Sequence, residues 1–223
     1  MNNLKSQDIV LAAVIDAFNN KKVTPTISAR DMGGSAYWEY KDQEGVDQAL
    51  RELENIYDYD FDVINKITLS DLAEFMGVSK SVIHASLRRL NDVNIISKTP
   101  YHLCQYAVHT EVFINLLIHG VPYFFPAKKG SIVRGIRTST DSPLMEKELK
   151  HDDMGFVWPY ISNNTGISLS PIHKSVPIVS LKSFHLYCLF GALDSIRVGK
   201  PRERAMAEKN VEALLKGQIN AEE

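Results

Sequence analysis

The sequence has very few cysteines and no long apolar run, and each shortage excludes a class of protein. Only Cys104 and Cys188 are present, far apart and in apolar surroundings, so two reduced buried thiols are expected instead of a disulfide or a metal site. No stretch approaches the roughly 20 apolar residues that cross a bilayer, and residues 1–5 do not resemble the start of a signal peptide. The sequence therefore predicts a soluble, cytoplasmic protein without membrane contact.

Signatures of enzymes and cofactor sites are also lacking. The seven histidines form no HExxH motif, and His102, Cys104 and His109 lack the spacing of a metal site. No nucleophile elbow, phosphate-binding loop or dinucleotide-binding glycine pattern occurs. The sequence therefore predicts no catalytic residue, no metal and no cofactor. An enzyme whose site is assembled from residues distant in sequence stays open, but it is the least favoured of the functions considered.

Charge is nearly balanced, with a formal net charge of −2, but it is unevenly distributed. From Asp31 to Asp62, ten acidic residues accompany only Lys41 and Arg51. The rest of the chain is mildly basic, a charge balance that is compatible with a nucleic-acid partner. This acidic, aromatic stretch lies within residues 21–66. Two interpretations stay open for it, namely a folded subdomain that contacts a partner protein or a neighbouring subunit, and a surface decoration.

Residues 68–96 carry the most informative pattern. Two short amphipathic helices are predicted there, separated by a turn at Gly77 and capped by Thr68 and Ser79. A tight turn between two short helices is typical of a helix-turn-helix, whose second helix, here about 79–93, enters the major groove of DNA. The apolar positions expected in the interior are Val82, Ile83, Leu87, Leu90 and Val93. The residues expected on the DNA-facing side and its flank are Lys80, Ser81, His84, Ala85, Arg88 and Arg89.

The runs Leu72–Ser79, Leu87–Leu90 and Ile95–Ile96 resemble the pattern of bacterial winged-helix regulators of the MarR-like type. The resemblance implies a winged helix-turn-helix that binds double-stranded DNA, although Ala85 stands where many relatives carry a basic or polar residue. Segments of the second half, such as HGVPYFFPAKKG and LDSIRVGKPRERAMAE, are similar to the C-terminal region of uncharacterised members of that group. The alternative, a helix-turn-helix used only for packing or protein contact, stays open.

The segments on either side complete the predicted winged-helix unit. Residues 6–19 form one apolar stripe and predict its first helix, which packs across the other two helices in a winged-helix domain. About 45 residues separate this helix from Thr68, where such relatives need only a short connection, so an acidic insertion is expected at about 21–66. Short strands at 95–97 and 105–108 predict a β-wing, with Lys98 and His102 at its tip able to touch DNA. The next predicted helix, 110–119, ends at Gly120 and is too apolar to be left in water, so we expect it to dock on the second half of the chain or on another subunit.

Beyond residue 120, short strands and loops are expected first, and then a helical hairpin over 183–198 and 201–216. Four basic residues near its turn predict contact with an anion or an acidic partner, with a solvated turn as the alternative. These four residues are Arg197, Lys200, Arg202 and Arg204.

The expected fold class is mainly α with small β elements (α+β). Residues 1–120 would form the winged helix-turn-helix domain, and residues 121–223 an α+β domain for dimerisation or for ligand or partner binding. The expected function is sequence-specific transcription regulation as a homodimer, because one short helix makes too few base contacts for a tight site. The alternative is an antitoxin-like or defence-associated protein that binds a partner protein and regulates its own synthesis.

Overall fold

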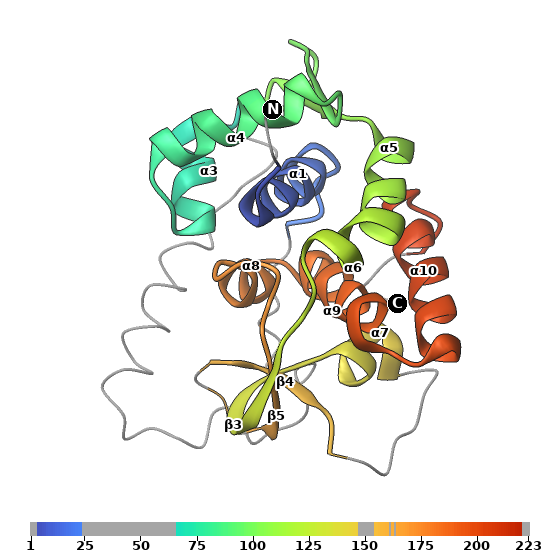
Figure 1. The fold of residues 1–223 in the computed structure, drawn as a ribbon. Coiled ribbons are helices and arrows are strands. Elements are labelled where there is room, and N and C mark those ends of the chain that lie inside the picture. The colour runs from blue at the N-terminus through green and yellow to red at the C-terminus, as the bar shows by residue number, and fades with distance from the viewer. Residues whose placement is uncertain (1–3, 24–65, 147–153, 161, 163, 220–223) are drawn as a thin grey trace.

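The computed structural model describes residues 4–23, 66–146, 154–160, 162 and 164–219, which form a mixed α+β fold (Figure 1). The predictions for the acidic stretch lie outside the described residues. The helices are α1 (Ser6–Asn19), α3 (Leu69–Met76), α4 (Lys80–Asp92), α5 (Thr110–Asn115), the π-helical turn η2 (Leu116–Gly120), α6 (Val121–Phe124), the 3₁₀ turn η3 (Ser139–Asp141), α7 (Pro143–Glu146), α8 (Val176–Lys182), α9 (Phe184–Val198) and α10 (Pro201–Leu215). The strands are β1 (Ile96–Lys98), β2 (Tyr106–Val108), β3 (Lys129–Thr138), β4 (Phe156–Pro159) and β5 (Thr165–Leu169).

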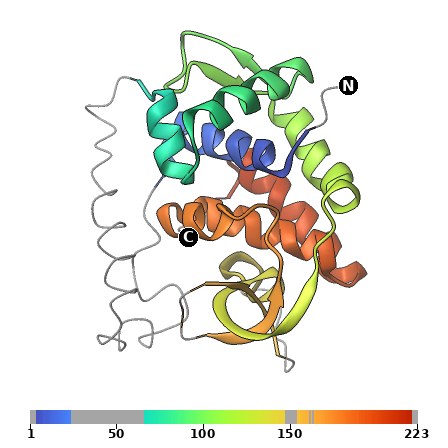
Figure 2. The ribbon, with the colours of Figure 1, turned by 60° about the vertical axis from the view of Figure 1, so that its left-hand side comes forward.

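Helix α1 lies between the α3–α4 pair and α9 and is buried along most of its length. Every residue from Asp8 to Phe18 is buried, because α1 packs against α3, α4 and β2 on one side and against α9 on the other (Figures 1 and 2). The predicted helix at 6–19 is confirmed. The expected packing against two helices accounts for only part of its contacts, because α9 from the C-terminal half covers a further face of α1.

The sequence predicted that the helix beginning at Thr110 would end at Gly120, but it continues past this residue. The chain continues through η2 into α6, with Pro122 in the first turn of α6. Proline has no N–H to donate, and the wider π-helical turn lets the helix pass this position without a break. Phe113, Leu117 and Val121 are buried, and this face meets α9 and α10. The expectation that it docks on the second half is confirmed.

Strands β3, β4 and β5 form a small closed sheet in the C-terminal half. The long strand β3 is antiparallel to both neighbours, while β4 and β5 pair in parallel. Gly135 makes this closure possible, because a Cβ atom there would collide with the carbonyl oxygen of Trp158. The sequence predicted short strands in this region but not a ten-residue strand.

Helices α9 and α10 form the predicted helical hairpin, and α8 precedes them. Cys104 and Cys188 are both buried free thiols, as expected. Buried side chains from α1, α3 and α4 belong to the same continuous cluster as those of α9 and α10. The boundary expected at residue 120 therefore does not divide the core. Within the described ranges, no helix is long and apolar enough to cross a membrane.

Candidate nucleic-acid interface

Helices α3 and α4 are joined by a tight turn whose geometry depends on three short-range features. Thr68 Oγ1 accepts hydrogen bonds from the N–H groups of Ser70 (3.2 Å) and Asp71 (3.3 Å), and Asp71 Oδ2 accepts one from the N–H of Thr68 at 2.7 Å. Gly77 has φ +63°, a left-handed conformation that glycine adopts without a Cβ penalty. Ser79 Oγ then accepts from the N–H of Val82 at 3.4 Å and caps α4. All three features were predicted from the sequence.

One face of α4 belongs to the core. Ile83, Leu87 and Leu90 are buried, as expected. Val93 was expected beside them but is 36% exposed. The physical reason is that α4 ends at Asp92, so that Val93 is the C-cap residue and no longer follows the helical period.

Arg89 ties α4 to α1 through a buried carboxylate. Its Nη2 lies 2.6 Å from Asp8 Oδ1 and its Nε lies 2.8 Å from Asp8 Oδ2. Arg89 Nη2 also donates to Ser86 Oγ at 3.0 Å, and Gln7 Nε2 donates to the same hydroxyl at 3.2 Å. The hydrogen bond with Asp8 raises the pKa of Arg89. Arg89 was expected at the flank of the DNA-facing side, and the structure directs its guanidinium inward instead, where it fixes the angle between the two helices.

The remaining predicted residues of α4 lie on its outward face. Lys80, Ser81, His84 and Arg88 are exposed, while Ala85 is half-buried. Ser79 Oγ and Ser81 Oγ are 2.9 Å apart, within hydrogen-bond distance. Figures 1 and 2 show α4 at the outer edge of the molecule, with α1 and α3 on its inner side. One continuous face of α4 therefore presents two cations, an imidazole and a hydroxyl to solvent.

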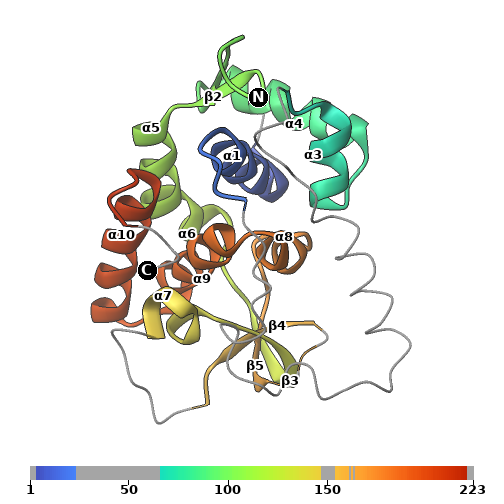
Figure 3. The same cartoon turned by 180° about the vertical axis from the view of Figure 1, so that it is seen from behind.

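The predicted strands that follow α4 form an antiparallel hairpin, in which Ile96 pairs with Val108 and Lys98 with Tyr106. The end of α1 holds the hairpin in place, since Asn19 Nδ2 donates to the carbonyl of Tyr106 at 2.7 Å. Asn19 Oδ1 accepts from the N–H of Cys104 at 3.2 Å. Figure 3 shows β2 at the same end of the molecule as α4.

The hairpin presents more to solvent than the two residues expected there. Lys98 and His102 are exposed, as expected. Between them, Tyr101 is 92% exposed, the most exposed of the large hydrophobic side chains in the described part of the chain. Tyr101 was not among the residues predicted to contact DNA, although its place between Pro100 and His102 in a predicted hairpin loop was a usable signal.

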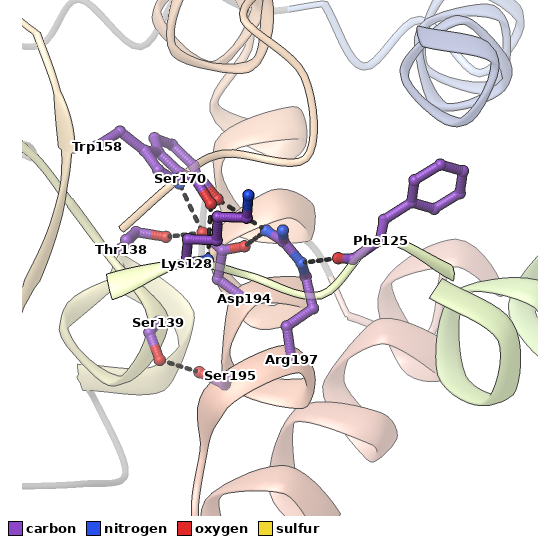
Figure 4. A network of polar contacts seen from close by, with 9 residues as sticks. All are labelled: Phe125, Lys128, Thr138, Ser139, Trp158, Ser170, Asp194, Ser195 and Arg197. Carbon is purple, nitrogen blue, oxygen red and sulfur yellow. Dashed lines mark hydrogen bonds and ion pairs between the residues drawn. The ribbon is translucent and has the colours of Figure 1, made fainter. Parts of the chain in front are cut away.

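The four cations near the α9–α10 turn are not brought together. Arg197 lies in the core, where Nη1 is 2.6 Å from Asp194 Oδ1 and Nε donates to the carbonyl of Phe125 at 2.9 Å (Figure 4). Arg204 Nε pairs with Glu208 Oε1 at 3.1 Å. Lys200 and Arg202 are exposed. Arg197 is thus part of the interior and not of an anion site.

The carboxylate of Asp194 is the centre of this buried network. Its Oδ2 accepts hydrogen bonds from Thr138 Oγ1 at 2.9 Å and from Trp158 Nε1 at 2.5 Å (Figure 4). Burial raises the pKa of Asp194, and the charge of Arg197 acts in the opposite direction. The network joins β3 and β4 to α9, so we assign it a structural role.

No group of three or more His, Cys, Asp or Glu side chains in the described ranges could hold a metal ion. Comparisons with models of protein families, with curated proteins and with solved structures gave no match. The MarR-like resemblance therefore remains a prediction from the sequence.

Proposed function

We propose that this chain is a sequence-specific DNA-binding transcription regulator. In this proposal α1, α3, α4 and the β1–β2 hairpin form a winged helix-turn-helix, and α4 is the recognition helix. The observation that carries the proposal is the outward face of α4 with Lys80, Ser81, His84 and Arg88, combined with the anchoring of its inner face by the core and by Arg89.

The size and chemistry of this face suit the major groove. A helix with its side chains is about 10–12 Å in diameter, and the major groove is about 12 Å wide, so the N-terminal half of the 13-residue α4 can enter it. Lysine and arginine donate to phosphates or to guanine, and serine and histidine can bond to base edges or phosphates. Lys98, His102 and Tyr101 on the hairpin extend the contact to the neighbouring backbone or minor groove.

A single recognition helix supplies few base contacts. Two copies that place their α4 helices one DNA turn apart, about 34 Å, would read a palindromic site and gain the affinity that one copy lacks. We therefore propose a homodimer on DNA.

The test starts from duplex fragments that the wild-type protein selects from a random-sequence pool and protects from nuclease. Lys80, His84 and Arg88 are then changed together to alanine. The matched control changes Lys128, His119 and Arg202, which are also exposed and have the same three side-chain types but lie outside α4 and the hairpin. We expect the first variant to lose protection and the control variant to keep it, with both folded by circular dichroism.

If the α4 variant keeps full affinity, this face is not the DNA-binding surface. An interaction protein of the antitoxin or defence-associated kind then becomes the better proposal. The exposed aromatic side chains of Tyr123 (72%) and Phe124 (73%) favour that second candidate, because large exposed apolar groups often mark protein contacts. A pull-down from native extract with wild type and with Phe124→Ser would test it.

A further inference from the structure

The corner between α8 and α9 contacts both helices that support α4. Lys182, the last residue of α8, is only 4% exposed. Its Nζ donates to the carbonyl of Phe75 at 2.9 Å and to that of Glu74 at 3.2 Å. The next residue, Ser183, donates from Oγ to the carbonyl of Lys22 at 2.9 Å, just beyond the end of α1. Two consecutive residues of the C-terminal half thus bind main-chain carbonyls at the ends of α3 and α1.

The contact of Lys182 matches the chemistry of a helix end. Carbonyls in the last turn of a helix carry partial negative charge and lack the usual partner four residues on, so a buried ammonium group stabilises them. The Glu74 carbonyl also accepts a hydrogen bond from the N–H of Gly77 at 3.2 Å. The same Nζ lies 5.3 Å from the centre of the Phe75 ring, in the range of a cation–π interaction. The Lys182 ammonium group therefore contacts the C-terminal turn of α3 at two main-chain carbonyls and at the Phe75 ring.

Helix α8 also approaches the turn that leads from α3 into α4. A Cβ atom added at Gly77 would lie 4.0 Å from Ile178 Cδ1, and the views from both sides show α8 beneath α3 (Figures 1 and 3). A side chain at this turn would thus be in van der Waals contact with the same helix that supplies Lys182, which places α8 close to the turn. A second contact, the ion pair between Asp8 and Arg89, fixes α4 against α1.

We propose that Lys182 is a positioning residue for DNA binding, acting from the C-terminal half on α3 and, through the Gly77 turn, on α4. This inference rests on the proposed function, because it concerns the surface of α4 that would read DNA. Lys182 itself does not touch DNA. It raises the fraction of molecules in which α4 has the orientation that fits the groove, and apparent affinity is proportional to that fraction.

The test compares Lys182→Met, which removes the ammonium group but keeps the chain length, with Lys182→Arg, which keeps the charge and the donors. Affinity is measured on the duplex fragment selected by the wild-type protein. Hydrogen exchange is followed separately in peptides from α3, α4, β3 and α9. We expect Lys182→Met to weaken DNA binding on the order of tenfold and to speed exchange in α3 and α4 only, and Lys182→Arg to restore most of both. Lys182→Gln, which retains a neutral donor, should fall between them and replaces Lys182→Met if that variant does not fold.

Two results would overturn the inference. One is a folded Lys182→Met protein with wild-type affinity and unchanged exchange in α3. The other is faster exchange throughout β3 and α9 that Lys182→Arg does not correct, since this would mean general destabilisation. If the wild-type protein itself selects no fragment, the proposed function fails, and this outcome is distinct from a wild-type protein that binds DNA as well as its Lys182→Met variant.

Discussion

Two buried aspartate–arginine ion pairs, Asp8–Arg89 in the first half and Asp194–Arg197 in the second half, have similar geometry but join different parts of the structure. In both pairs the closest N–O distance is 2.6 Å. Asp8 and Arg89 are 81 residues apart and join two helices, and the arginine side chain keeps 14% exposure. Asp194 and Arg197 lie within one turn of α9 and are 3% and 2% exposed. The first pair fixes the orientation of α4, which has an exposed face. The second pair joins β3, β4 and two loop carbonyls to the buried helix α9.

The depth of burial therefore does not indicate which pair matters for the proposed function. The more deeply buried pair is bound by protein groups from β3, β4 and two loop carbonyls. The less buried pair stands directly behind the outward face of α4. We therefore expect changes in the second pair to affect stability alone, and changes in the first to affect both stability and DNA binding.

The largest expected effect is at Arg197. Arg197→Met would leave Asp194 buried without its cation and would remove donors from the carbonyls of Phe125 and Ser170. Breaking a buried pair in this way lowers the free energy of unfolding by about 3–5 kcal/mol. Urea unfolding would measure it. Arg204→Met is the control, because its pair with Glu208 is about one-third exposed and should contribute less than about 1 kcal/mol.

Arg89→Met should have a smaller effect on stability. Asp8 would keep the hydrogen bond from the N–H of Lys5 at 2.7 Å, and Arg89 is already partly exposed, so we expect a loss of about 2–3 kcal/mol in the free energy of unfolding. DNA affinity should fall as well, because α4 loses its tie to α1. Arg88→Met is the adjacent comparison, and should leave stability within about 0.5 kcal/mol of wild type. Equal stability losses for the two neighbours would contradict the assigned roles.

A smaller, pH-dependent effect is expected at His185, which lies in the first turn of α9 and whose buried Nε2 has no hydrogen-bond partner among the described residues. Burial lowers the pKa of His185 to about 3, and the charge of Lys22 acts in the same direction. The unfolded chain takes up a proton below about pH 6.5, whereas the folded protein does not. The contribution of neutral His185 to the free energy of unfolding is therefore fully present above about pH 6.5 and is lost progressively as the pH falls toward 3.

Between about pH 7.5 and pH 5.5, wild type should lose about 1.4 kcal/mol more stability than His185→Gln, which does not titrate. Asp16 does not disturb the comparison, although burial raises its pKa, because it is present in both proteins. Parallel stability–pH curves for wild type and His185→Gln would show that His185 is not held neutral by burial.

The sequence predicted the elements whose signals are local. Thr68 with Asp71, the turn at Gly77 and the cap at Ser79 lie within a few residues of the helices that they start or end. The apolar period of α4 and the strands beside the hairpin loop are equally local. For these reasons α3, α4, the hairpin and the α9–α10 pair agree with the predicted elements.

What the sequence could not predict depends on distant partners. Arg89 looks like a second DNA contact beside Arg88 until Asp8, 81 residues away, is placed next to it. The sequence groups Arg197 with three other basic residues, but in the structure it pairs with Asp194, which also accepts hydrogen bonds from β3 and β4. In β3, nothing in the local sequence marks Gly135 as a strand residue whose lack of a side chain lets the strand approach the carbonyl of Trp158.

The most direct test of DNA binding by α4 is the salt dependence of affinity for two exposed arginine variants, Arg88→Ala on α4 and Arg202→Ala on α10. If Arg88 contacts a base in two places, its loss should cost about 1–3 kcal/mol on the selected fragment alone. If it contacts phosphate, the loss should be similar for all sequences, and the slope of log K against log salt should fall by about one unit. Arg202→Ala should match wild type in both measurements. Wild-type affinity and slope for Arg88→Ala, or equal losses for both variants, would contradict the claim that the outward face of α4 binds DNA.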